Sequence, residues 1–309
     1  MNRMLGRMKL VTGFAMILAC KGNAARSPDM RLVSLVPPSS QIVAGMSAPS
    51  NEFSRTNFFL MTPANRTDFA DFAAIVGSDP SRIIDQMIFT DSPSRSAGAA
   101  EHSLLVSGRF DANRILHNAN INEVTDAKDG IRIAVVKPFD RERSSFNEQR
   151  LLGIIDSRYL LLGSVASVEQ EIGRYLNGSR PDISIIKRLQ RLQRGADSWS
   201  LLSPVRFSSY LREVLSQLAP ELGSVGEHSC AFEFGIRYGW SRVEVEYSFN
   251  SICDSDSENR AEATIGKDPF WPGAGRSFAP APAGTGDLSR RINVPRTRYD
   301  AWLQRLALR

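Results

Sequence analysis

Cys20 stands at the end of a basic and then apolar N-terminal segment. Arg3, Arg7 and Lys9 precede an apolar stretch over residues 10–19, which is followed by small and polar residues. A basic segment, about ten apolar residues and a small-residue exit are typical of a secretory signal peptide. The sequence Ile-Leu-Ala-Cys at its end is similar to a bacterial lipobox, in which the cysteine becomes the lipidated first residue of the mature protein.

Two cleavage sites fit this signal peptide. The signal ends at residue 19 if Cys20 is lipidated, and it covers residues 1–24 if Gly-Asn-Ala is an ordinary signal-peptidase site. The lipobox departs from the usual pattern, since Ile17 stands where leucine is normal and Leu18 stands where a smaller residue is usual. We expect lipidation of Cys20 and attachment to a membrane through that lipid, because ten apolar residues are too few to span one.

Cys230 and Cys253 are candidates for a disulfide, because exported proteins keep disulfides that cytosolic proteins rarely hold. Apolar residues alternate from Cys230 to Tyr238 and again from Val243 onward, which predicts a hairpin with one buried face. If Tyr238 pairs with Val243 around a four-residue turn, Cys230 faces Ser251 and Cys253 is the diagonal neighbour on the same face. A two-residue shift or a bulge would bring the cysteines directly opposite. The hairpin therefore favours a Cys230–Cys253 disulfide.

A helix predicted over residues 182–194 separates basic from apolar side chains. Its basic residues fall within about 120° of arc, and its isoleucines and leucines cover the opposite side. Such a basic stripe can contact anionic lipid or glycan, and the alternative is a solvated outer face. The basic stripe consists of Lys187, Arg188, Arg191 and Arg194.

The net charge gives no support for nucleic-acid binding. The 309 residues carry a formal charge of +5, which falls to +2 when Arg3, Arg7 and Lys9 leave with the signal. The six arginines and two aspartates of residues 286–309 hold +4, so the body over residues 20–285 carries about −2. The body therefore offers no general field for a polyanion, and we expect no nucleic-acid partner.

The chain carries no recognisable catalytic or cofactor motif. It has no GxGxxG, GxxxxGK[ST], HExxH, GxSxG or CxxC sequence. His102, His117 and His228 are far apart in the sequence, so we interpret them as surface or capping groups rather than metal ligands. The sequence therefore predicts no catalytic residue, no cofactor and no metal site.

Hairpins followed by helices recur from about residues 83, 150 and 230 onward. This order predicts an α+β fold, an antiparallel sheet built from repeated hairpin–helix (ββα) units with helices packed on one face. The α+β domain is expected over 41–265, either as one unit or as two subdomains, 41–180 and 181–265. We expect an extended lead-in over 25–40 before it. A Pro/Gly/Arg-rich tail over 266–309 follows, extended or disordered until a short amphipathic helix at its end.

Two strand-to-helix junctions carry a resemblance. Gly-Arg-Phe-Asp at residues 108–111 and Leu-Gly-Ser at residues 162–164 resemble an uncharacterised group of exported bacterial proteins. Residues 36–45 and 77–80, with Asp85, are similar to the same group. The resemblance spans about 220 residues and implies export, but it brings no activity and no catalytic residue.

The sequence therefore favours an exported, lipid-anchored, non-catalytic binding or scaffolding protein of the bacterial cell envelope, periplasmic or at the outer envelope. Its partners would be the membrane, through the lipid on Cys20, and an envelope protein, anionic lipid or glycan. The alternative is an exported hydrolase whose catalytic residues converge only in the folded chain.

Overall fold

The computed structural model describes residues 27–47, 63–77, 82–92, 101–126, 128–137, 149–192, 196–203, 232–239, 241–249 and 288–307. The helices are α1 (Met30–Leu35), α3 (Pro63–Val76), α4 (Ala112–Leu116), α5 (Val165–Leu176), α6 (Ile183–Arg191) and α9 (Arg296–Ala307), with a 3₁₀ turn at Lys128–Gly130. The strands are β1 (Ile42–Ser47), β2 (Ile84–Ser92), β3 (Glu101–Gly108), β4 (Ile121–Asp126), β5 (Arg132–Val136), β6 (Arg150–Ile154), β7 (Tyr159–Ser164), β8 (Ser198–Leu202), β9 (Phe232–Tyr238), β10 (Arg242–Phe249) and β11 (Leu288–Pro295).

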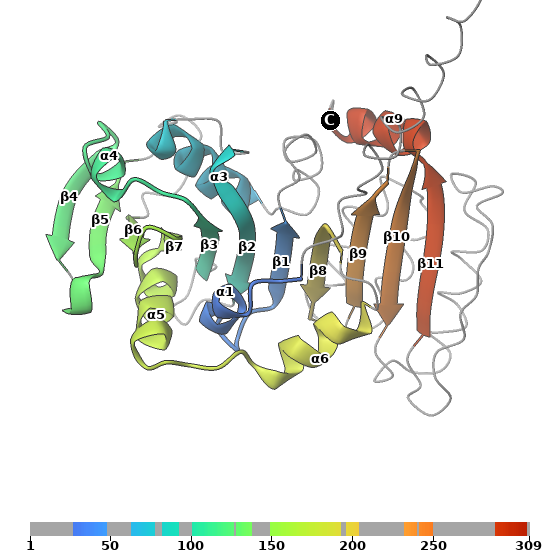
Figure 1. Ribbon diagram of the computed structural model, residues 1–309, viewed down its shortest axis with the longest axis horizontal. Helices are drawn as coiled ribbons and strands as arrows, with labels where there is room; N and C mark the ends of the chain where they lie inside the picture. The colour runs from blue at the N-terminus through green and yellow to red at the C-terminus, as the bar shows by residue number, and fades with distance from the viewer. Residues whose placement is uncertain are drawn as a thin grey trace, which may run out of the picture.

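The strands form one eleven-stranded sheet in the order β11-β10-β9-β8-β1-β2-β3-β7-β6-β5-β4 (Figure 1). Every neighbouring pair is antiparallel, so the predicted α+β class with an antiparallel sheet is confirmed. β1 joins the halves of the sheet, because it pairs with β2 on one side and with β8 on the other. The sheet thus runs without a break through both of the subdomains considered from the sequence.

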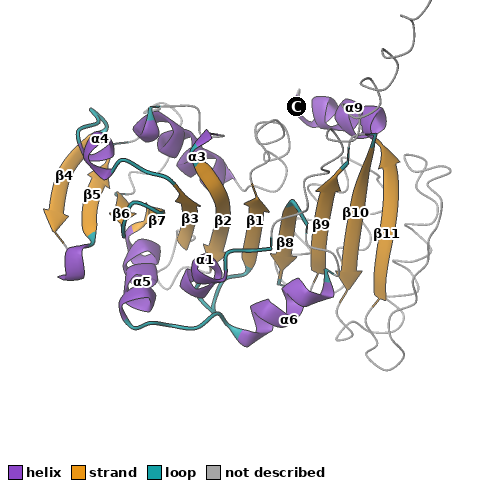
Figure 2. Cartoon of the chain, viewed as in Figure 1, coloured by secondary structure: helices purple, strands orange, loops and turns teal. Residues whose placement is uncertain are grey.

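Helices cover both faces of the sheet, so the expectation that they pack on one face is wrong. Met87 and Phe89 of β2 pack with Phe72 of α3 in one core, whereas Ile88 packs with Val168 of α5 in the other. Figure 2 shows α3, α4 and α9 on one side of the sheet and α1, α5 and α6 on the other. The central strands are apolar at successive positions, and both of their faces must therefore be covered.

Residues 25–40 were expected to form an extended lead-in, but they contain α1. The side chain of Asp29 accepts hydrogen bonds from the backbone N–H groups of Arg31 and Leu32, which caps the helix. Leu32 and Val33 are fully buried against the face that α5 covers. The capping aspartate and two buried side chains are enough to order a helix of only six residues.

The tail also differs from the expectation over its last part. β11 pairs with β10 from Leu288 opposite Phe249 to Pro295 opposite Arg242. The expected terminal helix is confirmed as α9, whose Tyr299 is 1% exposed and stacks edge-on against Tyr238 of β9. Among the described residues, no helix is both long enough and apolar enough to cross a membrane.

The hairpin of β9 and β10 has the predicted register. Tyr238 pairs with Val243, and the ladder continues to Phe232 opposite Phe249. The Gly239 N–H donates to the Arg242 carbonyl across the turn at 2.9 Å. Alternation of apolar residues therefore predicted the hairpin, and of the registers considered from the sequence the structure has the one in which Tyr238 faces Val243.

Candidate functional site

Some of the site residues predicted from the sequence lie on α6, and the others lie outside the described residues. Cys20, Cys230, Cys253 and Arg194 lie outside the described residues, so neither lipidation nor the disulfide is tested by the fold. Lys187 is exposed on α6, as expected for a member of the basic stripe. The backbone of Arg191 ends α6.

Arg188 does not lie on a free basic surface. Its Nε donates to Glu233 Oε1 of β9 at 2.7 Å, and its Nη2 donates to the Leu202 carbonyl of β8 at 2.8 Å. Glu233 is fully buried. Burying a carboxylate requires a cation and hydrogen bonds beside it, which explains why this arginine turns toward the sheet. The Arg188–Glu233 ion pair holds α6 on the sheet.

The first described residues are fastened to the start of β2. Gln86 donates from Nε2 to the Ser27 carbonyl at 2.7 Å and accepts from the Asp29 N–H at Oε1 at 2.6 Å. The Tyr159 hydroxyl lies 3.3 Å from Asp29 Oδ2 and donates to it. Burial raises the pKa of Tyr159, and the Asp29 carboxylate raises it further, so this hydroxyl keeps its proton. The chain therefore enters the fold at this end of β2.

Arg31 strengthens this attachment from α1. Its guanidinium carbon lies 5.1 Å from the ring centroid of Tyr159 and 4.9 Å from that of Tyr175. Its Nη2 also donates to the Tyr175 hydroxyl at 2.6 Å. Arg174 of α5 donates from Nε to the Ser34 carbonyl at 2.9 Å. Cation–π contacts and hydrogen bonds together fix α1 to α5 and β7.

A cluster of charged groups lies beneath α3, at the opposite end of the sheet. His102 Nδ1 of β3 lies 2.6 Å from Asp68 Oδ2. Arg150 of β6 pairs with Asp71 Oδ2, and its Nη1 lies 3.4 Å from Asp68 Oδ1, close enough for ionic attraction. Asp68 is fully buried and His102 is 7% exposed. His102 is therefore a buried partner of a carboxylate, not the surface or capping group expected from the sequence.

A histidine beside a carboxylate can act as a general base, provided that a nucleophile lies within hydrogen-bond reach. Ser103 follows His102 in the strand, but alternate side chains point to opposite faces. Its hydroxyl hydrogen-bonds to Thr90 and Glu171 on the α5 side. The Asp68–His102 pair thus lacks a serine partner in the neighbouring strand position. Its evident role is to tie α3 to the sheet.

Ser103 and Glu171 form a second buried polar group. Glu171 of α5 is fully buried, and burial raises its pKa to about 8. The hydrogen bond from Ser103 lowers this pKa, the charge of Asp68 raises it and the charge of Arg174 lowers it, but desolvation is the largest effect. Glu171 is therefore protonated at neutral pH.

These buried groups were missed from the sequence, although two weak signals for them exist. His102 and Ser103 directly precede the apolar run of residues 104–106 in the same strand. Glu171 follows Val168 by three residues, and helical spacing therefore places its carboxylate on the apolar face of α5. Their partners are distant in the chain and carry no recognisable spacing.

Comparison with solved structures adds one likeness. Crystal form III of TP0453 matches with a TM-score of 0.53 at 11% identity, covering 88% of this chain and 97% of that chain. The two chains share a fold. Crystal form IV of TP0453 gives a TM-score of 0.48 at 10% identity over 87% of this chain and 94% of that chain. Crystal form I of TP0453 gives a TM-score of 0.46 at 9% identity over 89% of this chain and 96% of that chain.

The comparisons go no further than the fold. No protein-family model matches the chain, and no curated protein matches it either. At 11% identity, the likeness to TP0453 transfers neither activity nor binding residues.

Proposed function

We propose that this chain is an exported protein of the bacterial cell envelope that is anchored by a lipid on Cys20 and binds or scaffolds without catalysing a reaction. The proposal starts from the basic and apolar N-terminal segment and from the Ile-Leu-Ala-Cys sequence at its end. The likeness to TP0453 contributes the fold alone.

The observation that carries the proposal is the attachment of the chain from Ser27 onward. Ser27 and Asp29 bond to Gln86, and α1 follows directly with fully buried side chains. Cleavage before Cys20 or after residue 24 leaves all of these contacts in place. A removable signal requires such a boundary, because the mature chain must fold without the segment that is cut away.

The proposed partners follow from the same arrangement. The membrane is contacted through the lipid on Cys20, and an envelope protein, an anionic lipid or a glycan is the second partner. Arg188 does not contribute to a ligand surface, since it is engaged with Glu233. Nucleic acid is not proposed, because the body of the chain carries a net negative charge.

Metabolic labelling with a fatty-acid analogue tests the anchor in the native host. The wild-type chain should carry the label and fractionate with the envelope, and Cys20→Ser should lose the label. Cys230→Ser is the matched control and should keep it. Equal labelling of wild type and Cys20→Ser would reject lipidation, and a full-length chain in the cytosol would reject export.

An exported hydrolase is the second candidate, and the Asp68–His102 pair is the observation that favours it. A hydrolase of this type would expose a nucleophile near His102. Reaction with a fluorophosphonate probe in wild type, lost in His102→Gln, would favour catalysis over scaffolding.

A further inference from the structure

A hollow of about 580 Å³ opens at the end of the sheet where β2 begins. The junction from β3 to α4 forms one wall and the turn from β6 to β7 forms the other. Two arginines, one carboxylate and one hydroxyl face it. The lining residues are Asp85, Gly108, Arg109, Phe110, Ser157 and Arg158.

The backbone around the hollow is rigid and its N–H groups are already used. Gly108 N–H donates to the Arg158 carbonyl at 2.9 Å, and Phe110 N–H donates to the Ser157 carbonyl at 2.8 Å. Asp111 caps α4 by accepting from the Arg114 N–H. Recognition of a ligand in the hollow therefore falls to the side chains.

The two arginines of the hollow are available for an anion. Arg109 and Arg158 are exposed, and neither guanidinium makes an ion pair or hydrogen bond with any described part of the chain. Arg158 lies over the ring of Tyr159, with 5.9 Å between guanidinium carbon and centroid. Asp85 reduces the charge of the hollow without cancelling it. Two planar guanidinium groups suit phosphate, because each can donate two parallel hydrogen bonds to it.

The hollow lies at the same end of the sheet as the entry of the chain. Gln86, which holds Ser27 and Asp29, follows the lining residue Asp85 directly. Only six residues lie between Cys20 and Ser27, and the seven Cα–Cα steps span at most about 25 Å when fully extended. An acyl chain on Cys20 would therefore keep this end of the molecule close to the lipid headgroups.

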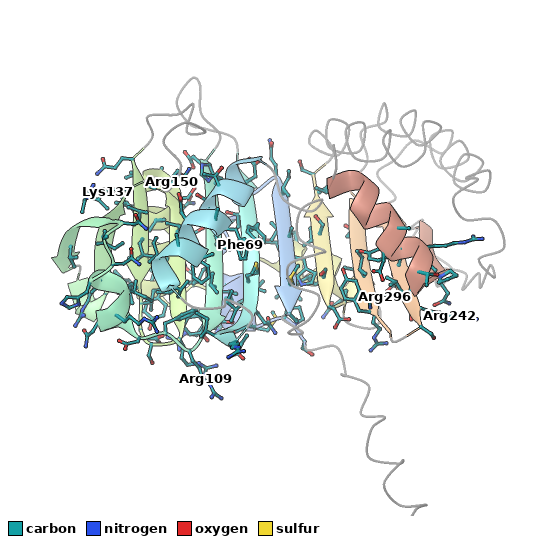
Figure 3. All side chains as sticks on the ribbon, turned by 90° about the horizontal axis from the view of Figure 1, so that it is seen from above. Phe69, Arg109, Lys137, Arg150, Arg242 and Arg296 are labelled. Carbon is teal, nitrogen blue, oxygen red and sulfur yellow. The ribbon has the colours of Figure 1, made fainter. Side chains whose placement is uncertain are left out.

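Further arginines lie along the same edge. Arg109, Arg242 and Arg296 lie along one side of the molecule, opposite Lys137 and Arg150 (Figure 3), and the Arg296 guanidinium lies over the ring of Tyr238. Arg242 and Arg298 are exposed and make no ion pair with the described residues, whereas Arg296 is held by Asp300. These charges add attraction toward an anionic surface over roughly 10 Å at physiological salt.

We infer that the hollow lined by Arg109 and Arg158 binds the phosphate group of an anionic phospholipid in the membrane that holds the anchor. The position of the bilayer rests on the proposed lipidation, but the chemistry of the hollow does not. This surface differs from the basic stripe expected on α6, and it is built by two turns at one end of the sheet.

Vesicle flotation tests the inference on the mature chain with Cys20→Ser, so that no acyl chain contributes to binding. Phosphatidylcholine vesicles are compared with vesicles that also contain phosphatidylglycerol. The chain should bind the anionic vesicles, and the double variant R109Q/R158Q should bind them about tenfold more weakly. Asp85→Asn removes the opposing charge and should strengthen binding.

Lys137→Gln with Lys187→Gln is the matched control, since it removes two positive charges outside the hollow, one half-buried and one exposed, and should leave binding nearly unchanged. An equal loss in the control would overturn the inference in favour of unspecific attraction. Binding of inorganic phosphate in solution without any preference for anionic vesicles would overturn the lipid headgroup as the ligand. The labelling of Cys20 tests lipidation, and vesicle flotation of the Cys20→Ser chain tests phosphate binding. Each proposal can therefore fail without the other.

Discussion

The buried hydroxyl of Ser103 on β3 donates a hydrogen bond to the carboxylate of Glu171 on α5. The contact crosses from the sheet to the helix layer, beside the apolar side chains of the core that α5 covers. Thr90 of β2 continues it, with its hydroxyl 2.6 Å from that of Ser103. A polar chain of this kind specifies how α5 sits on the sheet, because sliding the helix would leave buried polar groups without partners.

Glu171 should make stability depend on pH. Burial raises its pKa to about 8 from the ordinary glutamate value of 4.5, so the folded chain holds a proton that the unfolded chain releases. The free energy of unfolding should therefore fall as the pH rises from about 4.5 to about 8. Glu171→Gln keeps an acceptor for Ser103 and cannot ionise, so it should be more stable than wild type at pH 8 by about 2–4 kcal/mol.

Thermal unfolding between pH 5 and pH 9, a range of roughly 4 units around this pKa, measures the difference. Glu169→Gln, which changes an exposed carboxylate on the same helix, should leave the slope unchanged. An identical slope in Glu171→Gln and wild type would contradict the assignment.

Gly163 should tolerate no side chain. It pairs with Ser103 in the ladder, and a Cβ there would lie 2.3 Å from the His102 carbonyl oxygen and 2.7 Å from Ser103 Cα. Backbone atoms cannot move aside, so Gly163→Ala should destabilise the fold by about 3 kcal/mol. Gly173→Ala is the control, because no heavy atom lies within 4 Å, and it should stabilise α5 by up to about 1 kcal/mol. Chemical denaturation compares them, and equal midpoints would refute the close approach.

Loss of the Arg188–Glu233 ion pair should lower the free energy of unfolding, whereas loss of the exposed Lys187 charge should leave it nearly unchanged. Arg188→Met removes the cation beside a buried carboxylate and should cost about 3 kcal/mol. Lys187→Met should stay within about 0.5 kcal/mol of wild type. The double variant R188M/E233M should recover much of the loss, as a double-mutant cycle in urea would show. Full additivity of the two single changes would argue against the pairing.

A Cys230–Cys253 disulfide remains a prediction beyond the described ladder. The described pairing of Tyr238 with Val243 is the register for which the sequence makes Cys230 and Cys253 diagonal neighbours, so the bond requires a bulge beyond the described ladder or a distorted diagonal geometry. The bond would stabilise the fold by roughly 2–4 kcal/mol. Thiol titration of the denatured, non-reduced envelope protein should find neither cysteine free, and Cys20→Ser should give the same result. Two reactive thiols would exclude the bond.

Hairpins and helices, whose residues are close together in the chain, were predicted from the spacing of apolar residues. The alternation within residues 232–249 predicted a hairpin, and the separation of basic from apolar residues over 182–194 predicted α6. β11 was missed because the Pro/Gly-rich stretch before it dominated the composition, although Leu288, Ile292 and Val294 occupy alternate positions. The pairing of β1 with β8 was not predictable, since no local signal marks partners so distant in the chain.

The residues of the candidate site were predicted less well from the sequence than the helices and strands. Arg188 was assigned to a surface from helical spacing alone, but spacing does not show which flank of a stripe meets a buried carboxylate such as Glu233. Arg109 and Arg158 converge through two turns that are about 50 residues apart, and only the folded sheet brings them to one hollow.

The central position of β1 has a consequence for how the chain folds. β1 pairs with β2 through a connection of about 40 residues, but its other edge waits for β8, which begins roughly 150 residues after β1 ends. Until residues 198–202 are available for pairing, a row of unpaired N–H and C=O groups is open along residues 42–47. Such an edge invites pairing with another chain, and late, long-range closure folds slowly. The nascent protein therefore passes through a stage in which it needs shielding from its own copies.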